Sequence, residues 1–274
     1  MDAAWFEAEQ PVVGIVERTR TDDSDDAGTR PIRVDALEAT LNDADGDAVR
    51  GDPEDLLAAA PSLLVAAGEQ ALSAIARADP NVPVLPVGDV PGIDAVDHDV
   101  LPAALEAALA GEATIRQRSV LGLTVEPAGS KVLDDEVRER ALFDVALVTE
   151  EPAQISEYGV SSRGESVATV RADGVVVATS AGSHGYASAV DAPHLSASVD
   201  AVAVTPIAPF VVQTRQWVLP EDSLALTVER NETVVTLVAD DRPVCTVDVD
   251  SRVEIAVDGS LSVLSVPDAS LEGE

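Results

Sequence analysis

Apolar runs alternate with amphipathic stretches over the first 113 residues. Runs of aliphatic residues predict buried strands, and apolar positions three and four apart predict helices. The predicted strands are residues 11–17, 62–67 and 81–87, and the predicted helices are residues 35–41, a short helix opening at 52–55, 69–78 and 99–110. Asp35 and Asp52 are expected at helix N-termini and Gly111 at a C-terminus. Residues 19–29, rich in Asp, Ser and Thr, predict a solvated loop.

Strands that alternate with helices imply a parallel sheet with crossover helices. Ligands of such sheets bind beyond the carboxyl ends of the strands, which points to the turn at Gly68. After residue 114 the pattern changes to short alternating segments between Gly, Asp, Asn and Pro turns. These predicted strands are residues 119–125, 143–149, 155–161, 166–171, 174–178, 201–205, 223–228, 233–238, 244–249 and 260–266, with one short helix from residue 188 onward. The fold class is therefore α/β plus all-β, with an α/β domain at residues 1–113 and a β-sandwich-like domain at residues 114–274.

The chain has a large excess of acidic residues and almost no lysine. It carries 50 acidic and 17 basic residues, a formal net charge of −33, and Lys131 is its one lysine. Such a surface suits concentrated salt, where screening shortens the range of carboxylate repulsion. We therefore predict a salt-accumulating host. The same balance argues against a nucleic-acid partner, because few cations are present to neutralise phosphates.

Cysteine and histidine usage gives no sign of a metal centre. Cys245 is the one cysteine, in an alternating apolar stretch that predicts a buried small side chain. His98 and His194 lack the spacing of metal ligands, so no structural metal is expected. The N-terminal residues lack the features of a secretion signal, and no apolar run approaches membrane-spanning length. A cytoplasmic protein is expected.

Residues 172–186 read Ala-Asp-Gly-Val-Val-Val-Ala-Thr-Ser-Ala-Gly-Ser-His-Gly-Tyr. This predicts a charged turn, a buried strand, and a loop of small polar residues. Such a loop exposes backbone N–H groups, and Gly182 and Gly185 would remove bulk and tolerate positive φ, so main chain can approach a polar ligand. The alternative is a plain turn between strands.

This segment, with Val-Thr-Pro-Ile-Ala-Pro from Val204, resembles the NAD kinase family. The family signature runs Asp-Gly, an apolar strand, Thr-Pro-Thr-Gly-Ser-Thr-Ala-Tyr, and later Thr-Pro-Ile-x-Pro. The chain retains Asp173, Gly174, Thr179, Gly182, Ser183, Tyr186, Thr205, Pro206 and Pro209, and departs at Ser180, Ala181, His184 and Gly185. The resemblance implies an N-terminal Rossmann-like nucleotide-binding domain, a final strand that packs back on it, and a homo-oligomer.

The resemblance also implies phosphoryl transfer to NAD, from ATP with Mg²⁺ or from another donor. No Gly-x-x-x-x-Gly-Lys-Ser/Thr run exists, so the P-loop class is excluded. Where the family has Gly-Gly-Asp-Gly-Thr, residues 67–71 read Ala-Gly-Glu-Gln-Ala. Gly68 persists, Glu69 is the candidate general base for the ribose 2′-hydroxyl, and Gln70 replaces a phosphate-facing glycine. The alternative for Glu69 is an acidic residue in a first helical turn.

Further substrate-binding positions follow from the same resemblance. The family's Asn-Glu pair is Phe143-Asp144 here; Asp144 keeps an acceptor, whereas Phe143 offers only stacking or is a core aromatic. Arg171 and Asp173 stand where the family has an Arg and an Asp facing substrate, although a hairpin salt bridge is the alternative. The complete predicted binding set is Gly68, Gln70, Asp144, Arg171, Asp173, Thr179, Gly182, Ser183, His184, Gly185, Tyr186 and Ala189.

Two departures oppose phosphate binding or leave it open. Asp191 replaces a family glycine and would repel a phosphate. His184 can donate to a phosphate or act as an acid or base, but a solvent-facing loop histidine is the simpler interpretation. Three functions remain: an NAD kinase that forms NADP; a catalytically inactive relative that binds NAD(P) or another adenine nucleotide as a sensor or partner subunit; and a purely structural subunit.

Overall fold

The computed structural model describes residues 10–16, 32–128, 137–151, 156–211, 215–267 and 270. The chain divides into two compact units: unit 1 comprises residues 1–118 and 261–274, and unit 2 comprises residues 119–260. The loop predicted for residues 19–29, and Lys131, lie outside the described residues.

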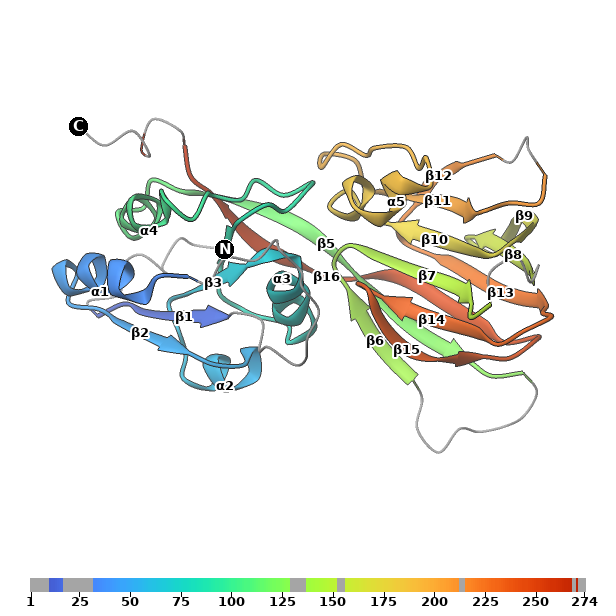
Figure 1. Cartoon of the computed structure of the whole chain (residues 1–274), viewed down its shortest axis with the longest axis horizontal. Coiled ribbons are helices and arrows are strands. Elements are labelled where there is room, and N and C mark those ends of the chain that lie inside the picture. Colours follow the sequence, from blue (N-terminus) through green and yellow to red (C-terminus); the bar gives the residue numbers. More distant parts are fainter. Residues whose placement is uncertain are drawn as a thin grey trace. The chain divides into compact units, whose positions relative to one another are not determined.

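Unit 1 is built on a parallel sheet in the order β2, β1, β3, β4 (Figure 1). Its strands are β1 (Val12–Val16), β2 (Asp47–Arg50), β3 (Leu63–Ala67) and β4 (Val84–Val87), and its helices are α1 (Val34–Asp43), α2 (Pro53–Ala58), α3 (Gly68–Arg77) and α4 (Leu101–Leu109). β1, β3 and β4 are apolar over nearly their whole length because both faces of a parallel sheet are covered. Their carboxyl ends lie at one edge of the sheet, so residues that follow these strands share that edge.

Local signals explain several helix ends in unit 1. Pro53 is the first residue of α2 and Asp52 is its N-cap residue, as predicted, although the Asp52 side chain makes no capping hydrogen bond. Beyond α4, the Gly111 N–H donates to the Ala108 carbonyl and the Glu112 N–H to the Ala107 carbonyl. This is the Schellman motif, and Gly111 has the left-handed φ of +78° that it requires. The predicted cap at Asp35 is wrong, because α1 begins at Val34 after Arg33.

Unit 2 contains two packed sheets. One is antiparallel, in the order β12, β11, β10, β7, β14, β15; the other contributes β16, β13, β8 and β9, with β5 beside β16 and β6 beside β5. The strands are β5 (Thr114–Glu126), β6 (Val137–Ala141), β7 (Asp144–Thr149), β8 (Ser156–Ser162), β9 (Glu165–Ala172), β10 (Gly174–Ala178), β11 (Ala201–Ile207), β12 (Trp217–Pro220), β13 (Leu224–Arg230), β14 (Val235–Ala239), β15 (Arg242–Val247) and β16 (Arg252–Ser265). One apolar cluster takes side chains from both sheets, for example Leu147, Tyr158 and Leu226. The predicted α/β plus β-sandwich-like fold class is confirmed.

A 3₁₀ turn, η2 (Gly182–His184), and the short helix α5 (Tyr186–Ala189) follow β10. Ala187 of α5 and Leu195 pack with Ala146 and Val176 in a second cluster, separate from the core between the sheets. α5 lies earlier than predicted, beginning at Tyr186 and ending at Ala189. Two long strands, β5 and β16, each contain residues of both units. The final residues of β16 belong to unit 1, where Val263 pairs in parallel with Val84 of β4.

Three strands were not predicted from the sequence. β2 and β6 are largely polar, Asp-Ala-Val-Arg and Val-Arg-Glu-Arg-Ala, and β12 is only four residues long. Each of the three lies at a sheet edge and pairs with a single strand that has a clear apolar signal: β2 with β1, β6 with β5, and β12 with β11. Neighbouring strands, rather than local sequence, determine that these segments are extended.

Candidate functional site

The first candidate segment is the passage from β3 into α3. All five residues of β3 are buried, and α3 begins directly at Gly68. Gly68 has φ +79°, a left-handed conformation that favours glycine. Ala67, the N-cap residue, offers no side-chain cap. The positive end of the helix dipole therefore lies at the carboxyl end of β3, a position that favours anions.

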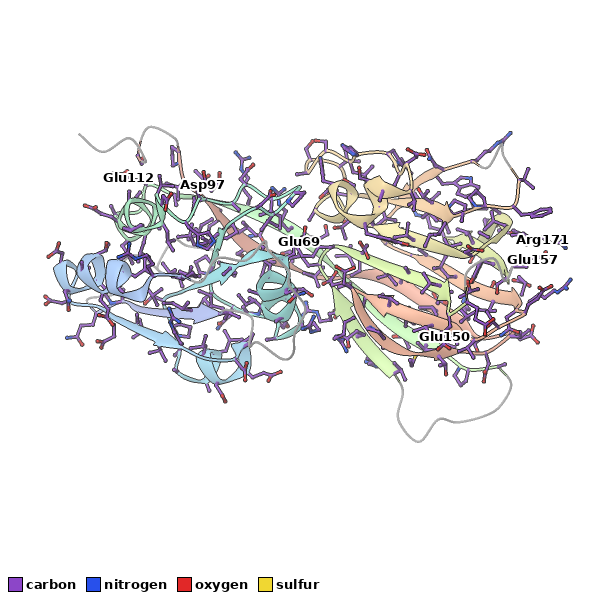
Figure 2. The ribbon with its side chains drawn as sticks, in the orientation of Figure 1. Glu69, Asp97, Glu112, Glu150, Glu157 and Arg171 are labelled. Carbon is purple, nitrogen blue, oxygen red and sulfur yellow. The ribbon has the colours of Figure 1, made fainter. Side chains whose placement is uncertain are left out.

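The three residues after Gly68 differ in their surroundings. Glu69 is partly buried in the first turn of α3 (Figure 2), Gln70 is exposed, and Ala71 is buried against the core. The first-turn position predicted as the structural alternative for Glu69 is confirmed, and a carboxylate there complements the helix dipole. Its role as a base stays a prediction. Ala71 faces protein, so this position offers neither a hydroxyl nor exposure to a ligand.

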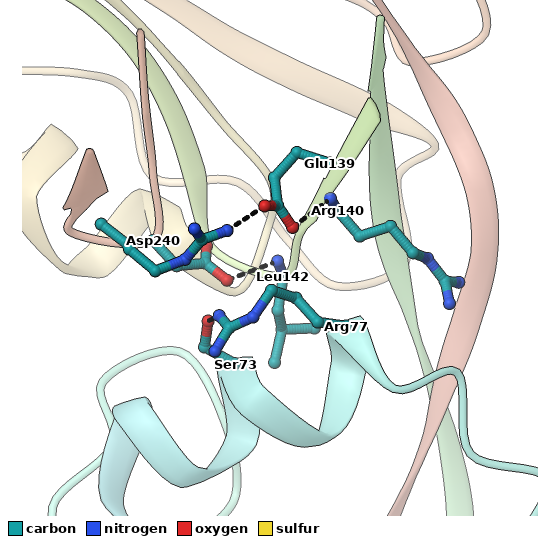
Figure 3. Close-up of polar contacts among 7 residues, drawn as sticks. Ser73, Arg77, Glu139, Arg140, Leu142 and Asp240 are labelled. Carbon is teal, nitrogen blue, oxygen red and sulfur yellow. Dashed lines mark hydrogen bonds and ion pairs between the residues drawn. The ribbon is translucent and has the colours of Figure 1, made fainter. Parts of the chain in front are cut away.

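The second candidate segment, residues 142–144, leads into β7. Phe143 and Asp144 are both buried, with 7% and 6% of their surface exposed. Phe143 is therefore a buried core aromatic, which was the alternative to a residue that stacks on a ligand. The Asp240 carboxylate accepts three consecutive N–H groups: that of Leu142 at 2.9 Å (Figure 3), that of Phe143 at 2.8 Å and that of Asp144 at 3.1 Å. These three hydrogen bonds fix the backbone conformation at the start of β7.

The third candidate segment runs from Thr179 to Tyr186. The buried Thr179 hydroxyl donates to the Leu142 carbonyl at 2.7 Å, and the Thr179 N–H donates to the Phe143 carbonyl at 2.9 Å. Gly182 packs so closely on Phe143 that an added Cβ would lie 2.8 Å from the Phe143 Cα and nearer still to its carbonyl group. Gly182 and Gly185 could tolerate positive φ, but neither is among the glycines with positive φ, and Gly185 has φ −88°. The close approach of the Phe143 backbone leaves no space for a side chain at position 182, so this position requires glycine.

Ser183 and His184 differ in burial, although the Ser183 Oγ lies 3.2 Å from the His184 Nδ1. Ser183 is fully buried, and its hydroxyl donates to the Ser180 carbonyl and accepts from the Leu195 N–H. His184 is exposed, as predicted, and its ring centroid lies 4.5 Å from that of His194. Ser183 therefore stabilises the loop internally, whereas His184 remains accessible from solvent.

Tyr186 connects the third segment with the second. Its side chain is 44% exposed. Partial burial, and then the nearby carboxylates of Asp144 and Asp241, raise the pKa of the Tyr186 phenol. The Tyr186 hydroxyl thus lies within electrostatic range of Asp144, while Ala189 is exposed at the end of α5. Asp144, Thr179, Gly182 and Tyr186 are brought together at one end of β7 and β10.

Arg171 and Asp173 lie elsewhere in unit 2. Arg171 pairs with Glu157 of β8, with 2.9 Å between Nε and Oε2 (Figure 2). Asp173 lies in the turn between β9 and β10, where its carbonyl accepts from the Thr149 N–H and the Tyr158 hydroxyl. At about 3.3 Å per residue, Asp173 and Thr179 are roughly 20 Å apart along β10. The structure does not bring Arg171 and Asp173 together with the Thr179–Tyr186 loop.

The described residues contain no group of three or more His, Cys, Asp or Glu side chains placed to hold a metal ion. Within the same residues, no helix is both long and apolar enough to cross a membrane. Cys245 is half-buried rather than fully buried, and burial raises the pKa of its thiol. The predicted burial of Cys245 is therefore partial, and its side chain packs against the core between the two sheets.

Comparison with known proteins concerns mainly unit 2. Residues 142–265 match the family model of the ATP-NAD kinase C-terminal domain. NAD kinase of Methanosarcina barkeri is 36% identical over 108 residues, which are 38% of this chain and 39% of that protein. NAD kinase of Geobacter sulfurreducens is 29% identical over 180 residues, 64% of this chain and 62% of that protein. Over residues 142–265 the chain is therefore similar to the C-terminal domain of ATP-NAD kinases.

Solved structures of NAD kinases extend the likeness in fold to nearly the whole chain. Yeast NADH kinase complexed with NADH superposes with a TM-score of 0.73 at 17% identity, covering 95% of this chain and 85% of that one. An NAD kinase from Archaeoglobus fulgidus in complex with ATP gives 0.70 at 19% identity, covering 95% of both chains. At such identities the likeness establishes the fold. In sequence, the matched segment spans about two fifths of the Methanosarcina barkeri NAD kinase.

The NAD kinase match contains every candidate residue of unit 2, from Asp144 to Ala189. It does not contain Gly68, Glu69 and Gln70. The part of the chain matched by the C-terminal model is therefore not the part predicted to carry the chemistry. The two groups belong to different units.

The sequence-based prediction missed two residues of the assembled loops. Asp240 and His194 lie 96 and 10 positions from Asp144 and His184, respectively, and yet they contact those segments. An Asp-Asp pair between two apolar strands does signal a turn. Nothing in that local pattern indicates which distant backbone the turn will bind.

Proposed function

We propose that this protein transfers a phosphoryl group to the 2′-hydroxyl of the adenosine ribose of NAD, giving NADP. The observation that carries the proposal is the NAD kinase match over residues 142–265, which includes the joined segments at Asp144 and Thr179–Tyr186. The likeness in fold to an NADH complex and an ATP complex supports NAD as acceptor and ATP, or another phosphoryl donor, as donor.

In this proposal, Glu69 acts as the general base. The Glu69 carboxylate takes the proton of the 2′-hydroxyl, whose oxygen forms the new bond to the γ-phosphorus of ATP as the bond to the bridging oxygen breaks and ADP leaves. Gly68, with its positive φ, and the N-terminus of α3 favour a phosphate there. In unit 2, Asp144 and the Thr179–Tyr186 loop hold the acceptor.

Mg²⁺ on the donor completes the proposed reaction. It would lower the charge of the transferring phosphates. Phosphate oxygens and water supply most of the ligands of a nucleotide-bound Mg²⁺, and one or two carboxylates suffice from the protein. The donor's phosphates and water would therefore hold most of the ion's coordination shell, and Glu69 would act as the base and not as its ligand.

The second candidate function is a catalytically inactive relative that binds NAD(P) or another adenine nucleotide. It is favoured by the turn after Gly68, where the exposed Gln70 replaces a family glycine and the buried Ala71 carries no hydroxyl. A side chain at position 70 takes space beside the proposed phosphates. A sensor or partner subunit would bind nucleotide through the unit 2 segments alone.

One experiment separates the two functions. NADP formation from NAD and ATP with Mg²⁺ is measured in molar KCl for the parent and for Glu69→Gln. Loss of the base is expected to lower turnover by about 10²-fold or more, because general bases typically contribute about 10²- to 10⁴-fold. Glu54→Gln is the matched control, because Glu54 is also a first-turn acid, on α2, and is exposed.

Turnover in the parent and in Glu54→Gln, but not in Glu69→Gln, supports the kinase and its base. Equal turnover in all three rejects Glu69 as the base. If the parent makes no NADP, yet NAD raises its melting temperature, the inactive relative is the correct function. If neither NADP formation nor a shift with NAD, NADP or ATP is seen, both proposals fail and the structural subunit remains.

The proposal also includes the setting of the protein. A cytoplasmic homo-oligomer in a salt-accumulating cell is supported by the acidic composition. The proposal of two domains, at residues 1–113 and 114–274, is supported in their number by the two compact units, which divide the chain at residues 118 and 260 instead. Exposed apolar side chains at Phe210 and Val211, which follow β11, and at Val218 of the edge strand β12 support assembly through the β domain. Light scattering in molar KCl measures the state, and a monomer would refute this part.

A further inference from the structure

We propose that Asp240 is a positioning residue of the nucleotide site: its carboxylate holds the backbone from which Asp144 and the Thr179–Tyr186 loop are presented. The inference rests on the proposed function, because it assumes that those segments bind the acceptor nucleotide. Asp240 is absent from the predicted binding set and is not itself placed against the ligand.

The contacts of Asp240 concentrate on three successive residues. Its Oδ2 accepts from the Leu142 N–H, and its Oδ1 accepts from the N–H groups of Phe143 and Asp144. In return, the Asp240 N–H donates to the Asp144 carbonyl at 3.0 Å. Four hydrogen bonds therefore join the turn between β14 and β15 to the start of β7, about a hundred residues earlier in the chain.

The residue type suits this task. An ionised carboxylate only accepts hydrogen bonds and can serve several N–H donors at once, and such charge-assisted bonds are stronger than neutral ones. Asp240 has φ +47°, in the left-handed region that Asp, Asn and Gly tolerate best. The turn geometry and the acceptor chemistry are thus satisfied by one side chain.

The same backbone is held from its carbonyl side by the candidate loop. The Thr179 hydroxyl donates to the Leu142 carbonyl, and the Thr179 N–H donates to the Phe143 carbonyl. The Gly182 N–H donates to the Thr179 hydroxyl at 3.2 Å. Asp240 therefore binds the N–H groups of residues 142–144, while Thr179 binds the carbonyls of Leu142 and Phe143. Both candidate segments thus contact the same stretch of backbone.

A shift of this stretch of backbone would move Asp144 and the Thr179 loop together. Displacements of about 1 Å can cost on the order of 10²-fold in activity. Removing the Asp240 carboxylate leaves three N–H groups without their acceptor, so the backbone of residues 142–144 would relax toward other partners. The expected consequence is weaker binding of the acceptor nucleotide by a protein that still folds.

The test measures NAD and ATP affinity by calorimetry in molar KCl, at a temperature well below unfolding. Asp240→Gly removes the carboxylate while keeping a residue that accepts φ +47°. Asp240→Asn keeps Oδ1, which serves Phe143 and Asp144, and replaces Oδ2. Asp250→Gly and Asp250→Asn are matched controls, because Asp250 is exposed and has φ +64° in another turn.

We expect Asp240→Gly to weaken NAD binding about tenfold or more, and Asp240→Asn to fall between it and the parent. If the parent turns over, the KM for NAD should rise more than kcat falls. The Asp250 variants should bind NAD like the parent, even where their melting temperatures fall. Faster amide exchange at residues 142–144 in Asp240→Gly, and not in Asp250→Gly, would show that this backbone has loosened.

Equal NAD affinity in Asp240→Gly and the parent would overturn this inference and leave the proposed function standing. Equal weakening in the Asp250 variants would also overturn it, because a general loss of stability would then explain the effect. If Asp240→Gly does not fold, Asp240→Asn decides by the same criteria. A parent that binds neither NAD nor ATP would reject the proposed function, and this inference with it.

Discussion

Gly182 shows how one residue position joins two segments. Its backbone lies against the carbonyl group of Phe143, and its N–H donates to the Thr179 hydroxyl. The space that a side chain would need is filled by protein backbone. The glycine in the loop thus serves packing between β7 and the loop, whichever ligand the loop binds.

Gly182→Ala is expected to lower the free energy of unfolding by about 3 kcal/mol or more, because an added Cβ collides with backbone that has no rotamer with which to move away. Chemical denaturation in molar KCl measures the change. Gly51→Ala is the control, since a Cβ there would make only ordinary contacts of 3.6 Å or more with Leu56. A loss below 1 kcal/mol in Gly182→Ala would contradict the packing role.

At the scale of elements, the turn between β12 and β13 shows how polar residues tie strands together. The Ser119 hydroxyl of β5 donates to the Glu221 carboxylate at 3.0 Å, and the Val257 N–H of β16 donates to the Glu221 carbonyl. Burial, and then Asp200 and Asp222, raise the pKa of Glu221, and the Ser119 bond only partly offsets this. Asp222, next in sequence, has its pKa lowered by the hydrogen bond from Arg163.

The opposite pKa shifts of Glu221 and Asp222 predict opposite effects of pH on the stability of the fold. A carboxyl whose folded pKa is raised above its ordinary 4.5 binds more protons when folded, so stability falls as pH rises through that window. Glu221→Gln should therefore be more stable than the parent at pH 7, by a few tenths of a kcal/mol after solvent screening, and equal to it below pH ~4. Thermal melts across this range measure the difference.

Asp222→Asn serves as the control of opposite sign. Its lowered pKa contributes stability that is present above its ordinary 3.8 and is lost as the pH falls. The variant should therefore melt below the parent at pH 7. Melting curves that shift in the same direction for both variants would contradict these assignments.

Element prediction succeeded where one segment carries its own signal. The buried run of β3, the Pro53 start of α2 and the Gly111 end of α4 all act within a few residues. The sequence did not predict β6 and β12, because their extended conformation depends on pairing with strands elsewhere in the chain. Cap chemistry was intermediate, because Asp52 occupies the cap position without making the bond.

The whole molecule is dominated by its charge. With a formal net charge of −33 on 274 residues, carboxylates repel one another over much of the surface. The Debye length is about 10 Å at 0.1 M salt and about 3 Å at 1 M, so only concentrated salt confines this repulsion to immediate neighbours. Ion pairs such as Arg163 with Asp222 are exposed and offset little of it.

The melting temperature should therefore fall steeply between about 2 M and 0.02 M KCl, because weaker screening raises the repulsion of the folded state. Differential scanning calorimetry measures the change. The same titration near pH 4, where many carboxylates are protonated, is the control and should show a smaller salt effect. A melting temperature independent of KCl at pH 7 would refute the adaptation to salt.

The sequence alone determined the alternation of strand and helix, the change to an all-β pattern near residue 114, the acidic surface and the residues of the NAD kinase resemblance. These depend on side-chain type and short spacing, which act locally. Only the tertiary structure decided that Asp240 binds residues 142–144, that Gly182 packs on Phe143, that Arg171 pairs with Glu157, and that Ala71 faces the core. Those contacts depend on strand pairing between distant segments, and backbone hydrogen bonding across a sheet leaves no local pattern from which the partner can be inferred.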